Sequence, residues 1–121
     1  MAKIEKNSTE KVMSQRLHQL QNLLEAQPSD CFLRYAIGLE LVKSEKFDEA
    51  ISCFNQLIQS NPEYTATYYQ LAQVYLLRNL KEEAEHVLIA GMKLTRDTDH
   101  HTFSELQNSL TNLHLGLLDD E

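Results

Sequence analysis

The segment Lys46–Phe54, KFDEAISCF, has a counterpart later in the chain, where Leu80–Leu88 reads LKEEAEHVL. Acidic, small and large apolar residues fall at the same places in both segments, with Ala50 and Ala84 at their centres. A fixed period of roughly 34 residues is typical of a chain built from repeated structural units. These two segments therefore indicate a repeat architecture.

The same period continues on both sides of these segments. Proline aligns with proline, tyrosine with tyrosine and small residue with small residue at Pro28 and Pro62, Tyr35 and Tyr69, and Gly38 and Ala72. Small residues at such positions allow two antiparallel helices to approach closely, so that ridges of one fit grooves of the other. We expect eight residues to pack the repeats: Ile37, Gly38, Ala50, Phe54, Leu71, Ala72, Ala84 and Leu88.

The pattern resembles the tetratricopeptide repeat (TPR), whose unit is a helix–turn–helix with this period. Arg34, Leu41 and Arg96 depart from the family pattern, because an aromatic residue, a tyrosine and a proline are expected there. The resemblance implies an all-α fold of antiparallel helix hairpins, an α-solenoid or right-handed superhelix of about six helices. Its matching positions are Ile37, Gly38, Ala50, Phe54 and Pro62, then Tyr68, Leu71, Ala72, Tyr75, Ala84 and Leu88.

We expect one domain over residues 1–121, since the chain is too short for two ordinary domains. Asn61 is the expected N-cap of a helix that has Pro62 in its first turn and runs to Arg78. The other expected helices are about 29–44, 47–60 and 80–94, and a polar break follows at 95–101 with Asp99 as N-cap. The parts are a flexible tail (1–8), a half-repeat helix (9–27), repeat one (31–64), repeat two (65–98) and a C-terminal capping helix (99–118).

The C-terminal helix has an apolar seam with alternating spacings of three and four, at Phe103, Leu106, Leu110, Leu113 and Leu117. A repeat array needs a terminal helix with a polar outer face, so we expect this helix to cap the array. The same spacing also suits a helix–helix interface with another chain.

The TPR resemblance implies a protein or peptide partner, bound on the concave face that the first helices of successive repeats form. The candidate peptide-binding residues are Tyr35, Leu39, Tyr69, Gln70 and Gln73. Phe32, Val42 and Leu76 share these helices but are expected in the core, and whether the groove is open or self-occupied stays undecided. Lys43 is the one nearby cation, so a clamp for a peptide's terminal carboxylate is missing.

Other function classes find little support in the sequence. The net charge of −7 argues against a nucleic-acid partner or an anionic membrane, since both need a basic surface. The N-terminus lacks the apolar run of a secretory signal and no apolar stretch is long enough to cross a membrane, so we expect a cytoplasmic location with reduced Cys31 and Cys53. No catalytic or cofactor motif occurs, and we expect a protein that is not an enzyme and has no cofactor.

The expected function is therefore that of a protein-interaction adaptor that binds a peptide or helical segment on its concave face. Two alternatives remain beside this adaptor. Apolar surface left by so few repeats could drive a homodimer. A metal-binding or enzymatic protein centred on His86, His100 and His101 is the weaker alternative, because these histidines do not have zinc-site spacing.

Overall fold

Two compact units, Met1–Leu57 and Ile58–Glu121, make up the chain in the computed structural model, which describes residues 15–116. Within 15–116 the structured elements are helices, with no strand. This confirms the predicted all-α class. The predicted tail (1–8), the start of the N-terminal helix and Leu117 lie outside the described residues.

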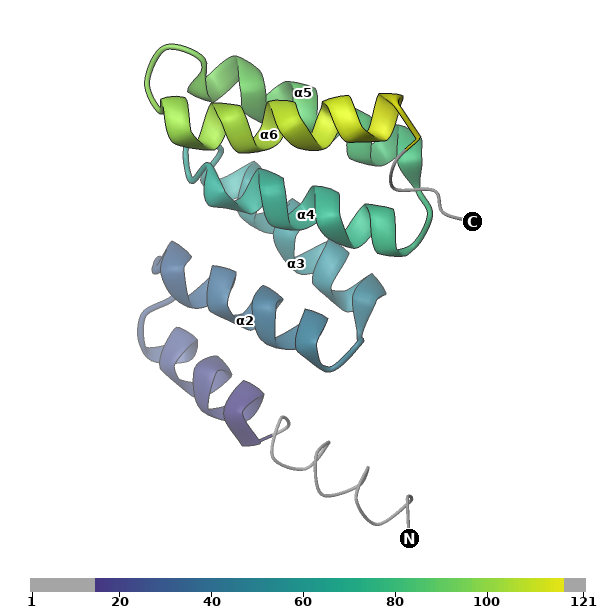
Figure 1. The fold of residues 1–121 in the computed structure, drawn as a ribbon. Helices are drawn as coiled ribbons and strands as arrows, with labels where there is room; N and C mark the ends of the chain where they lie inside the picture. Colours follow the sequence, from purple (N-terminus) through teal and green to yellow (C-terminus); the bar gives the residue numbers. More distant parts are fainter. Residues whose placement is uncertain (1–14, 117–121) are drawn as a thin grey trace, which may run out of the picture. The chain divides into compact units, whose positions relative to one another are not determined.

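The first unit contains a helix over residues 15–26, then α2 (Cys31–Lys43), and most of α3 (Phe47–Ser60) (Figure 1). The α3 bounds are those predicted from the sequence. α2 begins later than predicted, because the side chain of Asp30 accepts a hydrogen bond from the backbone N–H of Leu33 at 3.1 Å and so caps the helix. Ser29 lies in the preceding turn instead of the helix.

Gly38 brings α2 and α3 together in the first unit. A Cβ atom at Gly38 would lie 2.3 Å from Cε1 of Phe54, so only glycine allows this ring to lie against the α2 backbone. The Tyr35 ring packs on the same phenylalanine, with centroids 6.1 Å apart. Elsewhere on α2, the buried Glu40 carboxylate accepts a hydrogen bond from Nε of Arg16 at 3.2 Å and thereby ties the 15–26 helix to α2.

The second unit contains the end of α3, followed by α4 (Ala66–Leu77), α5 (Lys81–Thr95) and α6 (His100–His114). The predicted start of α4 at Asn61-Pro62 is wrong. The backbone N–H of Tyr64 donates to the carbonyl of Asn61 at 3.0 Å, and residues 62–63 form a turn. This turn follows α3, and α4 begins only at Ala66 with no side-chain cap on its first turn.

The two hairpins have the same turn. Glu45 and Asn79, which are one repeat period apart, both adopt a left-handed backbone conformation with φ of 61°. The N–H of Lys46 then donates to the carbonyl of Leu41 at 2.9 Å, and the N–H of Leu80 donates to that of Tyr75 at 2.8 Å. One left-handed residue therefore ends each first helix and reverses the chain.

The core of the second unit is a cluster of Tyr68, Ala72, Leu88 and Leu106, which α4, α5 and α6 contribute together. Figure 1 shows α6 alongside α5, with α4 adjacent to both. A Cβ atom at Gly91 of α5 would lie 2.9 Å from both Cδ1 of Leu106 and Cβ of Tyr68. This glycine therefore sets how closely α4 and α6 approach α5.

The polar break before α6 is shorter than the predicted 95–101. Thr95 is still helical and fully buried, with its hydroxyl donating to the carbonyl of Gly91 at 2.9 Å. His100 and His101 already belong to α6. Asp99 is the N-cap, as predicted, and accepts from the N–H of Thr102 at 3.1 Å and from its hydroxyl at 2.6 Å. These bonds hold the pKa of the Asp99 carboxyl below its usual range.

Candidate protein-interaction faces

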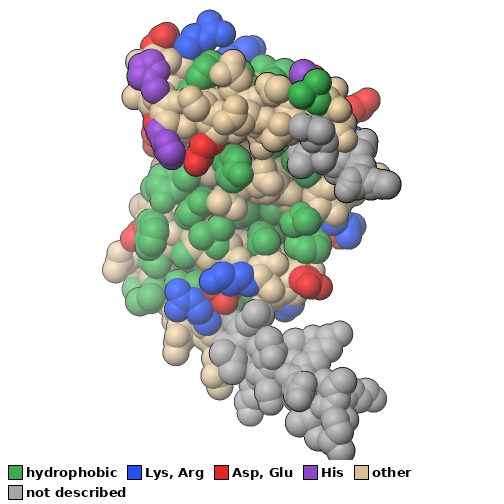
Figure 2. Space-filling view, viewed as in Figure 1, with side chains coloured by type: hydrophobic (Ala, Val, Ile, Leu, Met, Phe, Trp, Pro, Cys, Tyr) green, Lys and Arg blue, Asp and Glu red, His purple; other side chains and the backbone are tan. Residues whose placement is uncertain are grey.

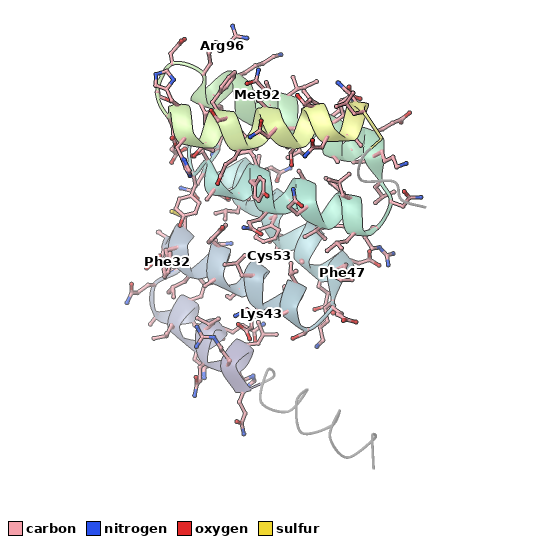
Figure 3. All side chains as sticks on the ribbon, in the orientation of Figure 1. Phe32, Lys43, Phe47, Cys53, Met92 and Arg96 are labelled. Atoms are coloured by element: carbon pink, nitrogen blue, oxygen red, sulfur yellow. The ribbon has the colours of Figure 1, made fainter. Side chains whose placement is uncertain are left out.

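One side of α2 carries Phe32, Tyr35 and Leu39, here called the α2 face. Spacings of three and four along the helix place the three side chains on the same side. Phe32 is 62% exposed and points outward at the beginning of α2 (Figure 3), so its predicted burial in the core is wrong. The reason is its position in the first turn, close after the Asp30 cap. Tyr35 and Leu39 are half-buried.

One side of α4 carries Tyr69, Gln70, Gln73 and Leu77, here called the α4 face. The first three are half-buried and Leu77 is 62% exposed. Tyr69 packs against the buried cluster of the second unit, so its ring is partly a core group and partly accessible. Figure 2 shows hydrophobic side chains gathered over α4. The predicted burial of Leu76 is likewise only partial, as is that of Val42 on α2.

Gln73 is held by the C-terminal helix. Its amide nitrogen donates to the hydroxyl of Ser109 in α6 at 3.1 Å, and Ser109 is nearly buried. The amide oxygen of Gln73 keeps its acceptor capacity. α6 therefore supports the α4 face. Sequence reasoning missed Ser109, because a partner so far along the chain and on a different element leaves no periodic signal.

α6 has a polar outer side, as a terminal helix requires. Leu106 of the predicted seam is fully buried, and Phe103, Leu110 and Leu113 are half-buried. His114 contacts Glu85 of α5 at 2.9 Å through Nε2 and closes one end of the α5–α6 pair. The exposed residues of α6 include His100, His101, Ser104, Glu105, Gln107, Asn108 and Thr111.

Charge is absent from the α4 segment itself. Its sequence, ATYYQLAQVYLL, contains no Lys, Arg, Asp, Glu or His. A charged partner would lose hydration against this helix without a compensating ion pair. The α4 face is therefore suited to uncharged, apolar side chains and to backbone amides that Gln70 and Gln73 can bond.

The histidines do not converge. His101 contacts Glu105 on its own helix at 3.3 Å, and His114 contacts Glu85. No group of three His, Cys, Asp or Glu residues within 15–116 could hold a metal ion. No helix in this part of the chain is long and apolar enough to span a membrane.

Both cysteines are free thiols. The Cys53 thiol donates to the carbonyl of Arg34 at 3.4 Å, which fixes its orientation between α2 and α3. Burial raises the pKa of this thiol, and the positive charge of Arg34 partly opposes the shift. A protonated, half-buried thiol of this kind is a packing group of low reactivity.

The chain belongs to the tetratricopeptide repeat family, whose model matches residues 41–106. The match covers both hairpin turns and reaches into α6. No curated protein sequence matches the chain. Family membership confirms the resemblance that the period indicated, and it supports a protein-interaction module, a fold that is generally non-enzymatic.

Solved structures agree with this assignment. A tetratricopeptide repeat domain protein from Salinibacter ruber is 28% identical, with 70% of this chain and 97% of that chain covered and a TM-score of 0.66. The translocator chaperone SycD of type III secretion from Yersinia enterocolitica is 15% identical (94% and 79% covered, TM-score 0.78). The TPR2B domain of yeast Sti1, in its complex with pHsp70, is 16% identical (89% and 94% covered, TM-score 0.68). The last two share the fold.

Proposed function

We propose that this protein is an adaptor that binds a peptide or helical segment of another protein through its α2 and α4 faces. The single observation behind the proposal is that apolar and aromatic side chains stay accessible on the first helix of each repeat, with Phe32 and Leu77 each 62% exposed. Exposed apolar side chains that gather on one surface mark sites of protein interaction. The proposed contact residues are Tyr35 and Leu39 of α2, and Tyr69, Gln70 and Gln73 of α4.

The equivalent positions of the two repeats support this proposal. Tyr35 and Tyr69 are one period apart, and so are Leu39 and Gln73. A tyrosine offers a flat apolar ring together with a hydroxyl, which suits it to an interface. The Sti1 domain, which shares the fold, is described in complex with pHsp70, and this is consistent with a protein partner here. A cytoplasmic location stays a prediction from the sequence.

The partner segment is proposed to be apolar and to bind without its terminal carboxylate being recognised. α4 carries no charge, and Lys43, four residues after Leu39 in the last turn of α2, lies on the same side as the α2 face. Recognition of a carboxylate relies on Lys and Arg side chains. A peptide with a free C-terminus and the same peptide with an amide terminus are therefore expected to bind equally well.

Capture of a partner on the immobilised chain from an extract of the native source tests the adaptor. Phe32→Ser and Leu77→Ser remove exposed side chains, so the fold is expected to survive and only capture to fall. Leu115→Ser, which changes a side chain that is 67% exposed beyond α6, is the matched control and is expected to capture normally. Equal capture by all three variants would contradict the proposal.

Self-association into a homodimer is the competing proposal. The polar outer side of α6 disfavours it, because this side offers little apolar surface to a second copy. A homodimer through the C-terminal seam would need side chains that already pack within the second unit, above all the fully buried Leu106. Sedimentation over a concentration series separates the two proposals. The adaptor predicts a constant mass, and a mass that doubles with concentration would favour the dimer.

A further inference from the structure

A second apolar surface lies on α5, apart from the α4 face. Residues three and four apart on a helix share a side, and spacings of three and four link the α5 residues His86, Ile89, Ala90, Lys93 and Leu94. Ala90 and Leu94 are exposed, Leu94 to 42%. This side borders a cleft of about 540 Å³. The cleft, here called the α5 cleft, has five apolar lining residues: Pro62, Tyr68, Ile89, Ala90 and Leu94.

The wall of the α5 cleft opposite α5 is held in place by a hydrogen bond. The hydroxyl of Tyr68 donates to the carbonyl of Pro62 at 2.8 Å, and Tyr68 is only 4% exposed. The absence of a side chain at Gly91 keeps Tyr68 close to α5. A cleft of this volume with a fixed wall and mostly apolar lining has the properties of a binding site for a short segment.

Lys93 is the cation among the lining residues of the α5 cleft, and both Lys93 and His86 are exposed. Lys93 makes no ion pair with any residue between 15 and 116, although the second unit carries more acidic than basic side chains. Glu63 follows Pro62 in the sequence and is exposed, but it does not line the cleft. Burial first, and then the negative charge of Glu63, raise the pKa of the Tyr68 phenol. Lys93 therefore places a positive charge on the α5 side of the cleft.

We propose that the α5 cleft is a second docking site, which takes a short protein segment with apolar residues in the cleft and an acidic residue directed at Lys93. The apolar lining supplies burial, and the ammonium group of Lys93 attracts the acidic residue and so sets the orientation of the bound segment. The lining residues of this site are separate from those of the α2 and α4 faces. Its partner can differ from the partner of those faces.

An NMR titration of the full chain, labelled with ¹⁵N, tests the site. The probes are three capped peptides, acetyl-Ala-Leu-Leu-X-Ala-amide, with X as Glu, Gln or Lys. The Glu peptide is expected to shift the amide signals of Ile89, Ala90 and Leu94 and to bind about two- to five-fold more tightly than the Lys peptide, which is the range for an exposed ion pair. Equal affinities for the three peptides would overturn the proposed charge recognition.

Two variants separate the roles of charge and apolar contact. Lys93→Gln is expected to abolish the preference for the Glu peptide. Leu94→Ser is expected to weaken the binding of all three peptides. Both side chains are exposed, so the spectra should retain the dispersion of the folded chain. Unchanged binding in both variants would overturn the site.

Leu77→Ser on the α4 face is the control that keeps this test apart from the adaptor proposal. It is expected to leave peptide shifts at α5 unchanged while it reduces partner capture. If the peptide shifts only amide signals of the α4 face, docking at the α5 cleft is contradicted, whereas the adaptor proposal is not. Shifts at α5 that grow with protein concentration alone would show a second copy in the cleft and also overturn the proposed occupant.

Discussion

The two hairpins solve the same packing problem with different pairs of residues. In the first hairpin Gly38 meets the large ring of Phe54, whereas at the equivalent positions of the second repeat Ala72 and the smaller Leu88 belong to one buried cluster. One added methyl group on the first helix accompanies a smaller side chain on the second. The repeats therefore preserve the summed volume of the pair more closely than the identity of either residue.

The largest change in stability is expected when this volume compensation is broken in the first hairpin. Gly38→Ala places a Cβ 2.3 Å from the Phe54 ring, and we expect the free energy of unfolding to fall by about 1–3 kcal/mol. Urea denaturation followed by circular dichroism measures the change. The double variant Gly38→Ala/Phe54→Leu copies Ala72 and Leu88 and should recover most of the loss. A double variant as unstable as Gly38→Ala would contradict volume compensation.

A smaller loss is expected at Gly91 in the second hairpin. The added Cβ of Gly91→Ala would lie 2.9 Å from the terminal Cδ1 of Leu106, which can move, and 2.9 Å from Cβ of Tyr68. We expect a loss of about 1–2 kcal/mol. Because both close contacts of the added Cβ lie in the second unit, hydrogen exchange should accelerate in α4 and α6 more than in α2. Uniform acceleration over both units would contradict this reading of Gly91.

At the two turns we expect substitutions to increase the stability, by less than the glycine variants decrease it. Glu45 and Asn79 share a φ of 61°, a conformation that costs glutamate more than asparagine. Glu45→Gly should raise the free energy of unfolding by about 0.5–1 kcal/mol, and Asn79→Gly should change it by only a few tenths. Thermal and urea denaturation measure both. Equal gains from the two substitutions would show that the residue type at the turn does not matter.

The smallest change in the free energy of unfolding is expected from protonation of the Asp99 carboxyl in the second unit. Hydrogen bonds from Thr102 lower the pKa of the Asp99 carboxyl in the folded chain. Its stabilising contribution is therefore complete above the pKa of the unfolded chain and is lost as the pH falls through the lowered folded value. The stability difference between the natural chain and Asp99→Asn, followed by urea denaturation between about pH 6 and pH 2, should shrink towards acid. A stability difference that does not change with pH would contradict the proposed contribution of the ionised Asp99 carboxyl.

Packing that recurs in both repeats was predictable from the sequence, whereas several contacts that occur once were not. The period located Gly38 and Ala72 and the bounds of α3, because packing between two helices of a hairpin recurs in both units. It misplaced the start of α4, since Asn61-Pro62 is equally compatible with a cap and with the turn that the Asn61 carbonyl closes. The bond between Gln73 and Ser109 joins α4 to the helix that follows the last repeat, so no period could reveal it.

Phe32 shows a second limit of the pattern. An apolar residue at helical spacing normally belongs to the core, yet its place in the first turn of α2 leaves it 62% exposed. Periodicity indicates the side of a helix on which a residue lies. Burial also requires that a neighbouring helix covers the helix at the height of that residue. Residues at helix ends are therefore the ones for which the core prediction fails.

The hairpin turns also bear on how the chain reaches its fold. Each is closed by a local hydrogen bond, from the N–H of Lys46 to the carbonyl of Leu41 and from that of Leu80 to the carbonyl of Tyr75. Closing so short a loop costs little entropy, and a chain dominated by such local contacts folds quickly. During synthesis α2 and α3 can pair before the residues of α6 leave the ribosome. The repeat thus lets each hairpin form as soon as its own residues are available.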